Sequence, residues 1–243
     1  MALLGLVILG PVAAADHVLE IERRVELRVD GEVDRSSTDR GRIYLGDQRA
    51  RFDQGDLQSW ILQLDRQRLL FLHHGEQTYL ELQLPARLED YLSAEERSKL
   101  ERAESELVPQ WSVEPTSEMR EFAAWKARKV LITGALERED TEYRHELWLS
   151  DELSIPLPLY QALIRSQGAV YFHFRDFATE LASLPGFPVY RQTRVTNDQG
   201  REHFETRRLV AVEERPAADR LYALPEGYTR VEFAQSQWAR VPD

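Results

Sequence analysis

The sequence contains no cysteine, which excludes a disulfide framework, a thiol nucleophile and a thiolate metal site. It also has little positive charge: 31 lysine and arginine residues stand against 42 aspartate and glutamate residues, for a formal net charge of -11. Such a chain has no basic stripe to displace the counterions of nucleic acid, so we expect no nucleic-acid partner. Its 243 residues do suffice for one sizeable hydrophobic core.

The amino-terminal segment, residues 1–15, has no charged side chain. Its apolar run is too short to span a hydrocarbon core of about 30 Å, but it suits the central region of a secretory signal. Small residues precede Asp16, which predicts cleavage after Ala15. The alternative is a buried amino-terminal strand or helix, which the two glycines and the proline of the segment disfavour. We expect a periplasmic or secreted protein, soluble after cleavage, with 16–243 as one domain and no stable membrane span.

Strand patterns dominate the first part of the expected mature chain. From Leu19 to Val29, apolar and charged residues alternate with a period of two, which is typical of a half-buried antiparallel strand. Further strands, separated by turn pairs, are predicted at 42–45, 49–52, 59–64, 69–73 and 78–84. Several of them are polar on one side, so we expect a meander that packs on one face only.

Helical patterns begin after Pro85. Ser93-Ala94-Glu95-Glu96 is a capping box, which predicts a charged surface helix within 86–108. Two more helices are predicted from Pro156 and over 175–184. The later strands are predicted at 111–114, 127–136, 143–150, 189–196 and 202–213. Without an internal repeat or a linker, the pattern favours one β-rich α+β domain.

Patterns for catalysis and metal binding are absent from the sequence. No two histidines have helical i,i+4 or strand i,i+2 spacing, and His73 and His74 project to opposite faces of a strand. A metal site assembled from distant segments stays open. There is no Gly-x-Ser-x-Gly and no phosphate-binding glycine pattern. We expect no cofactor and no enzymatic activity; a hydrolase becomes an alternative if His145 is hydrogen-bonded to a carboxylate in a cleft.

Aromatic residues suggest a binding site. Ordinary core packing explains any single one of them. The alternative is that some line a cavity between a curved sheet and its covering helices, where an apolar ligand would lie. The candidates for lining or gating such a cavity are Trp60, Phe71, Trp125, Trp148, Tyr171, Phe172 and Phe174.

The order of elements resembles that of the LolA/LppX-like superfamily, with greatest similarity to its secreted half-barrel branch. The most similar segments are 92–97 (Leu-Ser-Ala-Glu-Glu-Arg), 146–150 (Glu-Leu-Trp-Leu-Ser), 184–189 (Leu-Pro-Gly-Phe-Pro-Val) and 224–228 (Leu-Pro-Glu-Gly-Tyr). The resemblance covers nearly all of 16–243. It implies an antiparallel unclosed β half-barrel with helices covering the concave face, as in periplasmic carriers of lipids and lipoproteins. No arginine here matches the carriers' lid-locking arginine, so no functional residue is carried over.

Two functions are compatible with this resemblance. The first is a non-catalytic periplasmic carrier for a lipid, an acyl chain or a lipoprotein, with the helix of 86–108 and the stretch 171–174 gating the cavity. The second is an envelope protein–protein interaction module whose half-barrel is a filled core without a small-molecule ligand. The missing cysteine excludes a lipid anchor of the lipoprotein type, which separates this chain from the superfamily's membrane-tethered members.

Overall fold

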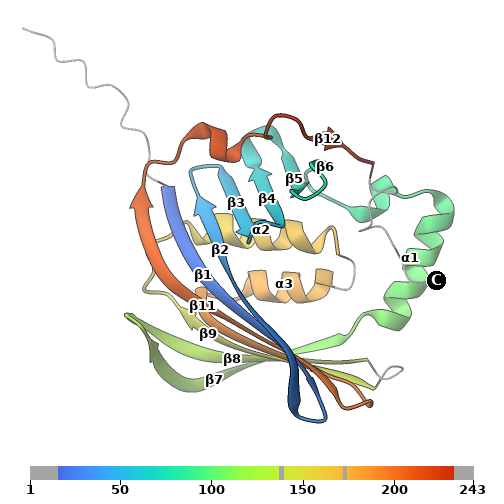
Figure 1. Ribbon diagram of the computed structural model, residues 1–243, viewed down its shortest axis with the longest axis vertical. Coiled ribbons are helices and arrows are strands. Elements are labelled where there is room, and N and C mark those ends of the chain that lie inside the picture. The colour runs from blue at the N-terminus through green and yellow to red at the C-terminus, as the bar shows by residue number, and fades with distance from the viewer. Residues whose placement is uncertain (1–15, 137–139, 172–173, 233–243) are drawn as a thin grey trace, which may run out of the picture.

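The structure is a computed structural model that describes residues 16–136, 140–171 and 174–232 (Figure 1). The predicted signal segment and the candidate Phe172 lie outside the described residues. The strands are β1 (Asp16–Val29), β2 (Glu32–Leu45), β3 (Arg49–Gln54), β4 (Gln58–Gln63), β5 (Arg68–His73), β6 (Thr78–Gln83), β7 (Gln110–Phe122), β8 (Trp125–Leu136), β9 (Thr141–Ser150), β10 (Phe187–Thr196), β11 (Arg201–Arg215) and β12 (Thr229–Arg230). The helices are α1 (Ala94–Leu107), α2 (Leu157–Gly168) and α3 (Arg175–Ser183). Short 3₁₀ turns cover Leu64–Arg66, Leu88–Tyr91 and Asp219–Tyr222.

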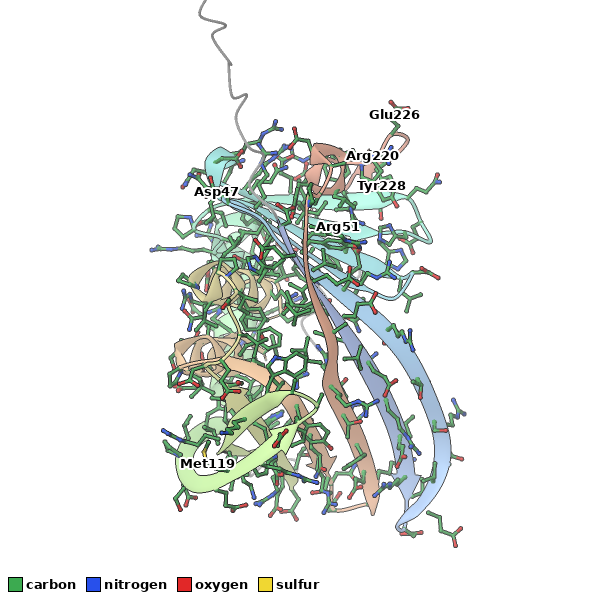
Figure 2. All side chains as sticks on the ribbon, turned by 90° about the vertical axis from the view of Figure 1, so that its left-hand side faces the viewer. Asp47, Arg51, Met119, Arg220, Glu226 and Tyr228 are labelled. Atoms are coloured by element: carbon green, nitrogen blue, oxygen red, sulfur yellow. The ribbon has the colours of Figure 1, made fainter. Side chains whose placement is uncertain are left out.

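The described strands form one sheet in the order β12-β6-β5-β4-β3-β2-β1-β11-β10-β9-β8-β7. Neighbours are antiparallel except β12, which runs parallel to β6. Within the described residues the edge strands β7 and β12 do not pair with each other, so the sheet stays open. Figure 2 shows it curving around α2 and α3, which lie on its inner side. The predicted α+β fold, an unclosed antiparallel half-barrel with helices on its concave face, is confirmed.

Strand β2 is much longer than the sequence predicts. Only 42–45 has the apolar character of a buried strand, and the preceding residues 32–40 are almost all polar and exposed. These residues nevertheless pair with β1 along its length, whereas β3 pairs with β2 only from Gly41 onward. Backbone hydrogen bonds to one neighbour therefore hold this part of β2, and its polar side chains suit an unpaired sheet edge.

Side chains of β4 and β5 alternate between two hydrophobic clusters. Those on the concave face, which join the main core with α2 and α3, are Trp60, Leu62, Leu69 and Phe71. Those on the convex face are Ile61, Leu70 and Leu72, and they pack with side chains of residues 216–230, here called the carboxyl-terminal strap. The prediction of packing on one face only is therefore wrong for these strands, because the strap covers the second face.

The strap is held by polar contacts as well as by apolar packing. The hydroxyl of Tyr222 donates to the buried carboxylate of Asp16 at 2.5 Å. The hydroxyl of Tyr228 lies 2.5 Å from Nδ1 of His74, whose Nε2 lies 2.7 Å from Oγ of Ser59. Figure 2 labels Tyr228 near Arg51, whose guanidinium donates to the strap carbonyl of Leu221 at 2.7 Å. The strap is thus a fixed part of the domain.

The helices begin where their sequences predict. In α1 the predicted capping box is confirmed: Ser93 Oγ accepts from the Glu96 amide at 3.2 Å, and the Glu96 carboxylate accepts from the Ser93 amide at 2.7 Å. Helices α2 and α3 pack closely because α2 ends at Gly168, where a Cβ atom would meet the Cβ of Ala178 at 2.8 Å. This close approach places both helices over the same concave surface.

Candidate binding site

A cavity of about 270 Å³, partly open to solvent, lies between the concave face and the helices α2 and α3. Its sheet wall consists of Ile21, Ile43, Phe52, Gln54, Gln58, Trp60, Arg191, Arg207 and Leu209, together with Phe187 and Pro188 at the start of β10. Its helix wall consists of Tyr160, Ile164, Gln167, Tyr171, Phe174 and Leu181. Most of these side chains are apolar, so the cavity suits a molecule with a hydrocarbon body.

Three of the predicted aromatic residues line this cavity: Trp60, Tyr171 and Phe174. The rings of Trp60 and Tyr171, from β4 and from the connection between α2 and α3, lie 5.7 Å apart edge to face. Phe71 does not line the cavity. It is 2% exposed on β5, lies beside Trp60 on the concave face, and packs its ring 4.2 Å from that of Trp60, so it supports the wall from the side.

The other two described candidates lie elsewhere. Trp148 follows Leu147 on β9 and therefore points to the opposite face of the sheet. There its Nε1 donates to Glu146 at 2.9 Å, and its ring lies 5.3 Å from that of Phe122. Trp125 pairs with Phe122 at the hairpin between β7 and β8 and is partly buried against the core. Strand alternation and hairpin position thus keep both tryptophans away from the cavity.

A row of three arginines crosses the concave face where the cavity ends. On adjacent strands, Arg191 of β10 lies opposite Arg207 of β11, and Arg207 lies opposite Arg23 of β1. Like charges at such positions repel one another. Two residues along β11 on the same face, the carboxylate of Glu205 accepts hydrogen bonds from all three: 2.7 Å from Arg207 Nε, 2.8 Å from Arg191 Nη2 and 2.7 Å from Arg23 Nε. Glu205 therefore holds the row together.

The charges of this cluster shift its pKa values in different directions. Burial alone would raise the pKa of Glu205, but Arg207, Arg191 and Arg23 hold it well below its usual range. The pKa of Arg207 is lowered, first by burial and then by Arg191, although Glu205 opposes both. The pKa of Arg23 is raised, because Glu205 and a second partner, Asp39, outweigh the effect of burial. Arg23 thus has two carboxylate partners, Glu205 and Asp39, whereas Arg207 has only Glu205 among the described side chains.

His145 lies beside the arginine row without a carboxylate partner. Its Nδ1 is 2.9 Å from Oγ1 of Thr193, and its ring packs 4.1 Å from that of Phe177. Burial, and then the charge of Arg191, lower its pKa to about 3, so it is neutral at pH 7. The arrangement that would revive a hydrolase, His145 hydrogen-bonded to a carboxylate, is not the one the structure has. In the described ranges, no three His, Asp or Glu side chains are grouped to hold a metal ion.

The arginine row was not predicted, although the strand sequences contain a signal for it. In β1 the apolar phase Leu19, Ile21, Val25 and Leu27 is broken by Arg23. In β11 the alternate residues that face inward are Leu209, Arg207 and Glu205, so an apolar position is followed by two charged ones. A charged residue at an apolar position of a strand points into the core, where it needs a partner. Which residues meet across the strands follows only from the register.

Comparison with known proteins gives structural likeness alone. No protein-family model and no curated protein matches the chain. The structure is similar to MucB in complex with MucA(peri), with 15% identity and a TM-score of 0.33; the match covers 84% of this chain and 54% of that one. The chain thus spans about half the length of that protein.

It is also similar to a LolA superfamily protein from Nitrosomonas europaea, with 9% identity and a TM-score of 0.28; the match covers 85% of this chain and 90% of that one. The second match comes from the superfamily that the sequence resembles. Likenesses of this size carry no conclusion about ligand or partner. In the part of the chain that the structure describes, no helix has the length and apolar character to cross a membrane.

Proposed function

We propose that the protein is a non-catalytic binding or carrier protein that holds a lipid, an acyl chain or a similar apolar molecule between its sheet and its helices α2 and α3. The observation that carries this proposal is the cavity of about 270 Å³ with its mostly apolar wall. Export through residues 1–15 would place the activity in the periplasm or outside the cell. Burial of the ligand would supply affinity at about 25 cal/mol per Å² of apolar surface.

A filled core is the alternative, and it predicts no continuous cavity between the sheet and the helices. The structure has a cavity there, which Trp60, Phe52 and Ile164 help to line. A cavity lined by rigid aromatic and branched side chains therefore supports a ligand-binding role over a purely structural one.

We assign the gating of the cavity to Tyr171 and Phe174, which lie between α2 and α3 and line the cavity. Burial raises the pKa of Tyr171 to about 12, so its hydroxyl stays uncharged beside an apolar ligand. The described side chains of α1 do not contribute to the cavity wall, so the predicted role of α1 as a second gate has no geometric support here.

Uptake of a neutral apolar probe tests this proposal. The lipid-stripped protein should bind N-phenyl-1-naphthylamine with a rise in fluorescence. Ile21→Trp adds volume to the sheet wall and should weaken binding at least about tenfold. Leu27→Trp is the matched control, because Leu27 lies on the same face of β1 but is 41% exposed and outside the cavity.

Two results would contradict the proposal. A protein that takes up no probe, and that carries no small molecule in native mass spectrometry after gentle purification, has the filled core of an interaction module. Equal weakening by both tryptophan variants would place the probe elsewhere. Circular dichroism of each variant shows whether the fold is retained.

A further inference from the structure

We propose that the ligand of this cavity carries an anionic head group, a carboxylate on a single alkyl chain being the simplest case, and that Arg207 and Arg191 bind that head. The inference rests on the proposed binding function and adds the class of molecule that the cavity serves. Its basis is the chemistry of one end of the cavity.

The wall of the cavity changes from apolar to cationic over two residues along β11. Leu209 and Ile21 are cross-strand partners on β11 and β1, and both line the apolar part. Two residues further along β11 on the same face lies Arg207, with Arg191 opposite it on β10, and both also line the cavity. At the other side, Trp60 on β4 is separated from β11 by β3, β2 and β1. A chain lying across these strands would end at the two arginines.

The charges that the structure describes at this end do not balance. Arg23, Arg191 and Arg207 face the carboxylates of Glu205 and Asp39, which leaves one positive charge uncompensated among the described side chains. The other described titratable groups beside them do not supply the missing anion. His145 is neutral, as described above. The phenol of Tyr160 is neutral as well, because burial raises its pKa to about 12.

Hydrogen-bond donors are also left over at this end. Arg207 uses Nε for Glu205, and within the described residues its Nη1 and Nη2 atoms make no hydrogen bond. Its side chain is 27% exposed although it lies deep enough for burial to depress its pKa, so its exposed surface faces the cavity. Nε of Arg191, another cavity-lining residue, is buried and has no hydrogen-bond partner among the described residues. An anionic oxygen would satisfy such donors and the spare charge together.

The volume restricts the body of the ligand. A cavity of about 270 Å³ is slightly smaller than the usual range of ligand pockets, about 300–1,000 Å³. The enclosed volume suits one alkyl chain, and further chains of a bulky lipid would lie outside it. The predicted ligand is therefore a single-chain anionic amphiphile.

Matched ligands test this inference on the unaltered protein. Dodecanoate and dodecanol share a chain length and differ in the charge of the head, and each is titrated as a competitor of N-phenyl-1-naphthylamine. Dodecanoate should bind at least about tenfold more tightly than dodecanol, the size of effect that hydrogen bonds to a charged group give. Acetate should not compete, because it lacks the chain.

Variants locate the effect in the cavity. Arg207→Gln should reduce the preference for dodecanoate over dodecanol to within about twofold. Arg191→Gln provides the same test if Arg207→Gln does not fold. Arg23→Gln is the matched control, because it removes an equal charge from Glu205 but lies outside the cavity wall, and it should keep the preference.

Each outcome has a distinct meaning. Binding of neither ligand, nor of the neutral probe, would overturn both the proposed function and this inference. Equal affinity for dodecanoate and dodecanol would leave the binding function standing and overturn the anionic head. Loss of the preference in Arg23→Gln as fully as in Arg207→Gln would also overturn it, because the effect would then come from the cluster's total charge and not from the cavity wall.

Discussion

The two ends of the molecule are built differently. At one end, β4 and β5 are buried on both faces, by the helices on the concave side and by the carboxyl-terminal strap on the convex side. At the other end, the β1–β2 hairpin and the β7–β8 hairpin leave large apolar side chains exposed, among them Leu27, Val33 and Met119. Figure 2 shows Met119 at the end of the molecule opposite Arg51 and Tyr228.

This difference locates the site. The cavity and the arginine row lie where the covered end meets the uncovered one. Toward the covered end the side chains of β1, such as Leu19, are fully buried, and beyond Arg23 they become exposed at Leu27. A ligand at this boundary can bury its chain among apolar residues and place its head beside the arginine row. We infer that the covered end supplies stability and the boundary supplies binding.

Truncating a leucine at each end gives the largest expected difference. Leu70→Ala empties a fully buried position on the convex face of β5 and should lower the free energy of unfolding by about 2–5 kcal/mol. Leu27→Ala, at a position that is 41% exposed, should change it by no more than about 0.5 kcal/mol. Urea denaturation measures both, and equal losses would contradict the division into two ends.

Removing one hydroxyl tests whether the strap belongs to the covered end. Tyr222→Phe leaves the buried carboxylate of Asp16 without its donor and should cost about 1.5–3 kcal/mol. Tyr228→Phe removes a hydrogen bond to the imidazole of His74. This partner is neutral, unlike the carboxylate of Asp16, so the loss should be smaller, about 1 kcal/mol. Thermal unfolding would rank the two variants. Wild-type stability in both would mean that the strap is a dispensable addition.

Low pH should decrease the free energy of unfolding through His145, which lies at this boundary. Its pKa is about 3 in the folded protein and about 6.5 when unfolded, so below pH 6.5 the unfolded state binds the proton first. Stability present above pH 6.5 is then lost at up to about 1.4 kcal/mol per pH unit as the pH falls toward 3, which is about 2 kcal/mol between pH 6.5 and 5.

The variant His145→Gln isolates this contribution. Denaturation at pH 7 and pH 5 should show a smaller pH dependence for the variant than for the wild type. His74, whose pKa is also lowered, first by burial and then by Arg51, accounts for a remainder of the same sign. An unchanged slope in His145→Gln would mean that this histidine is not buried in the neutral form.

The sequence predicted those parts of the fold that local chemistry determines. The alternation from Leu19 to Val29 became β1, and the capping box at Ser93 begins α1. The polar residues 32–40 gave no strand signal, because their conformation comes from pairing with β1 and not from burial. Packing of the strap on β5 was missed for a related reason: its partners are far apart in the sequence.

The site was only partly predictable. Aromatic residues on strands and near helix ends identified Trp60, Tyr171 and Phe174, which line the cavity, but also Trp148, which lies on the opposite face. Their chemistry is the same, and only the register and the placement of the helices separate them. Arg207 lies among many charged residues of an acidic chain, and its role depends on neighbours brought together from three strands.

The decisive experiment is a crystal structure of the protein soaked with 12-bromododecanoate. We expect an anomalous bromine peak inside the cavity, in the apolar part that Trp60 and Ile164 line. We also expect a carboxylate oxygen about 2.7–2.9 Å from a guanidinium nitrogen of Arg207. A bromine peak outside the cavity, or a carboxylate turned to solvent with the arginines unoccupied, would contradict the proposal.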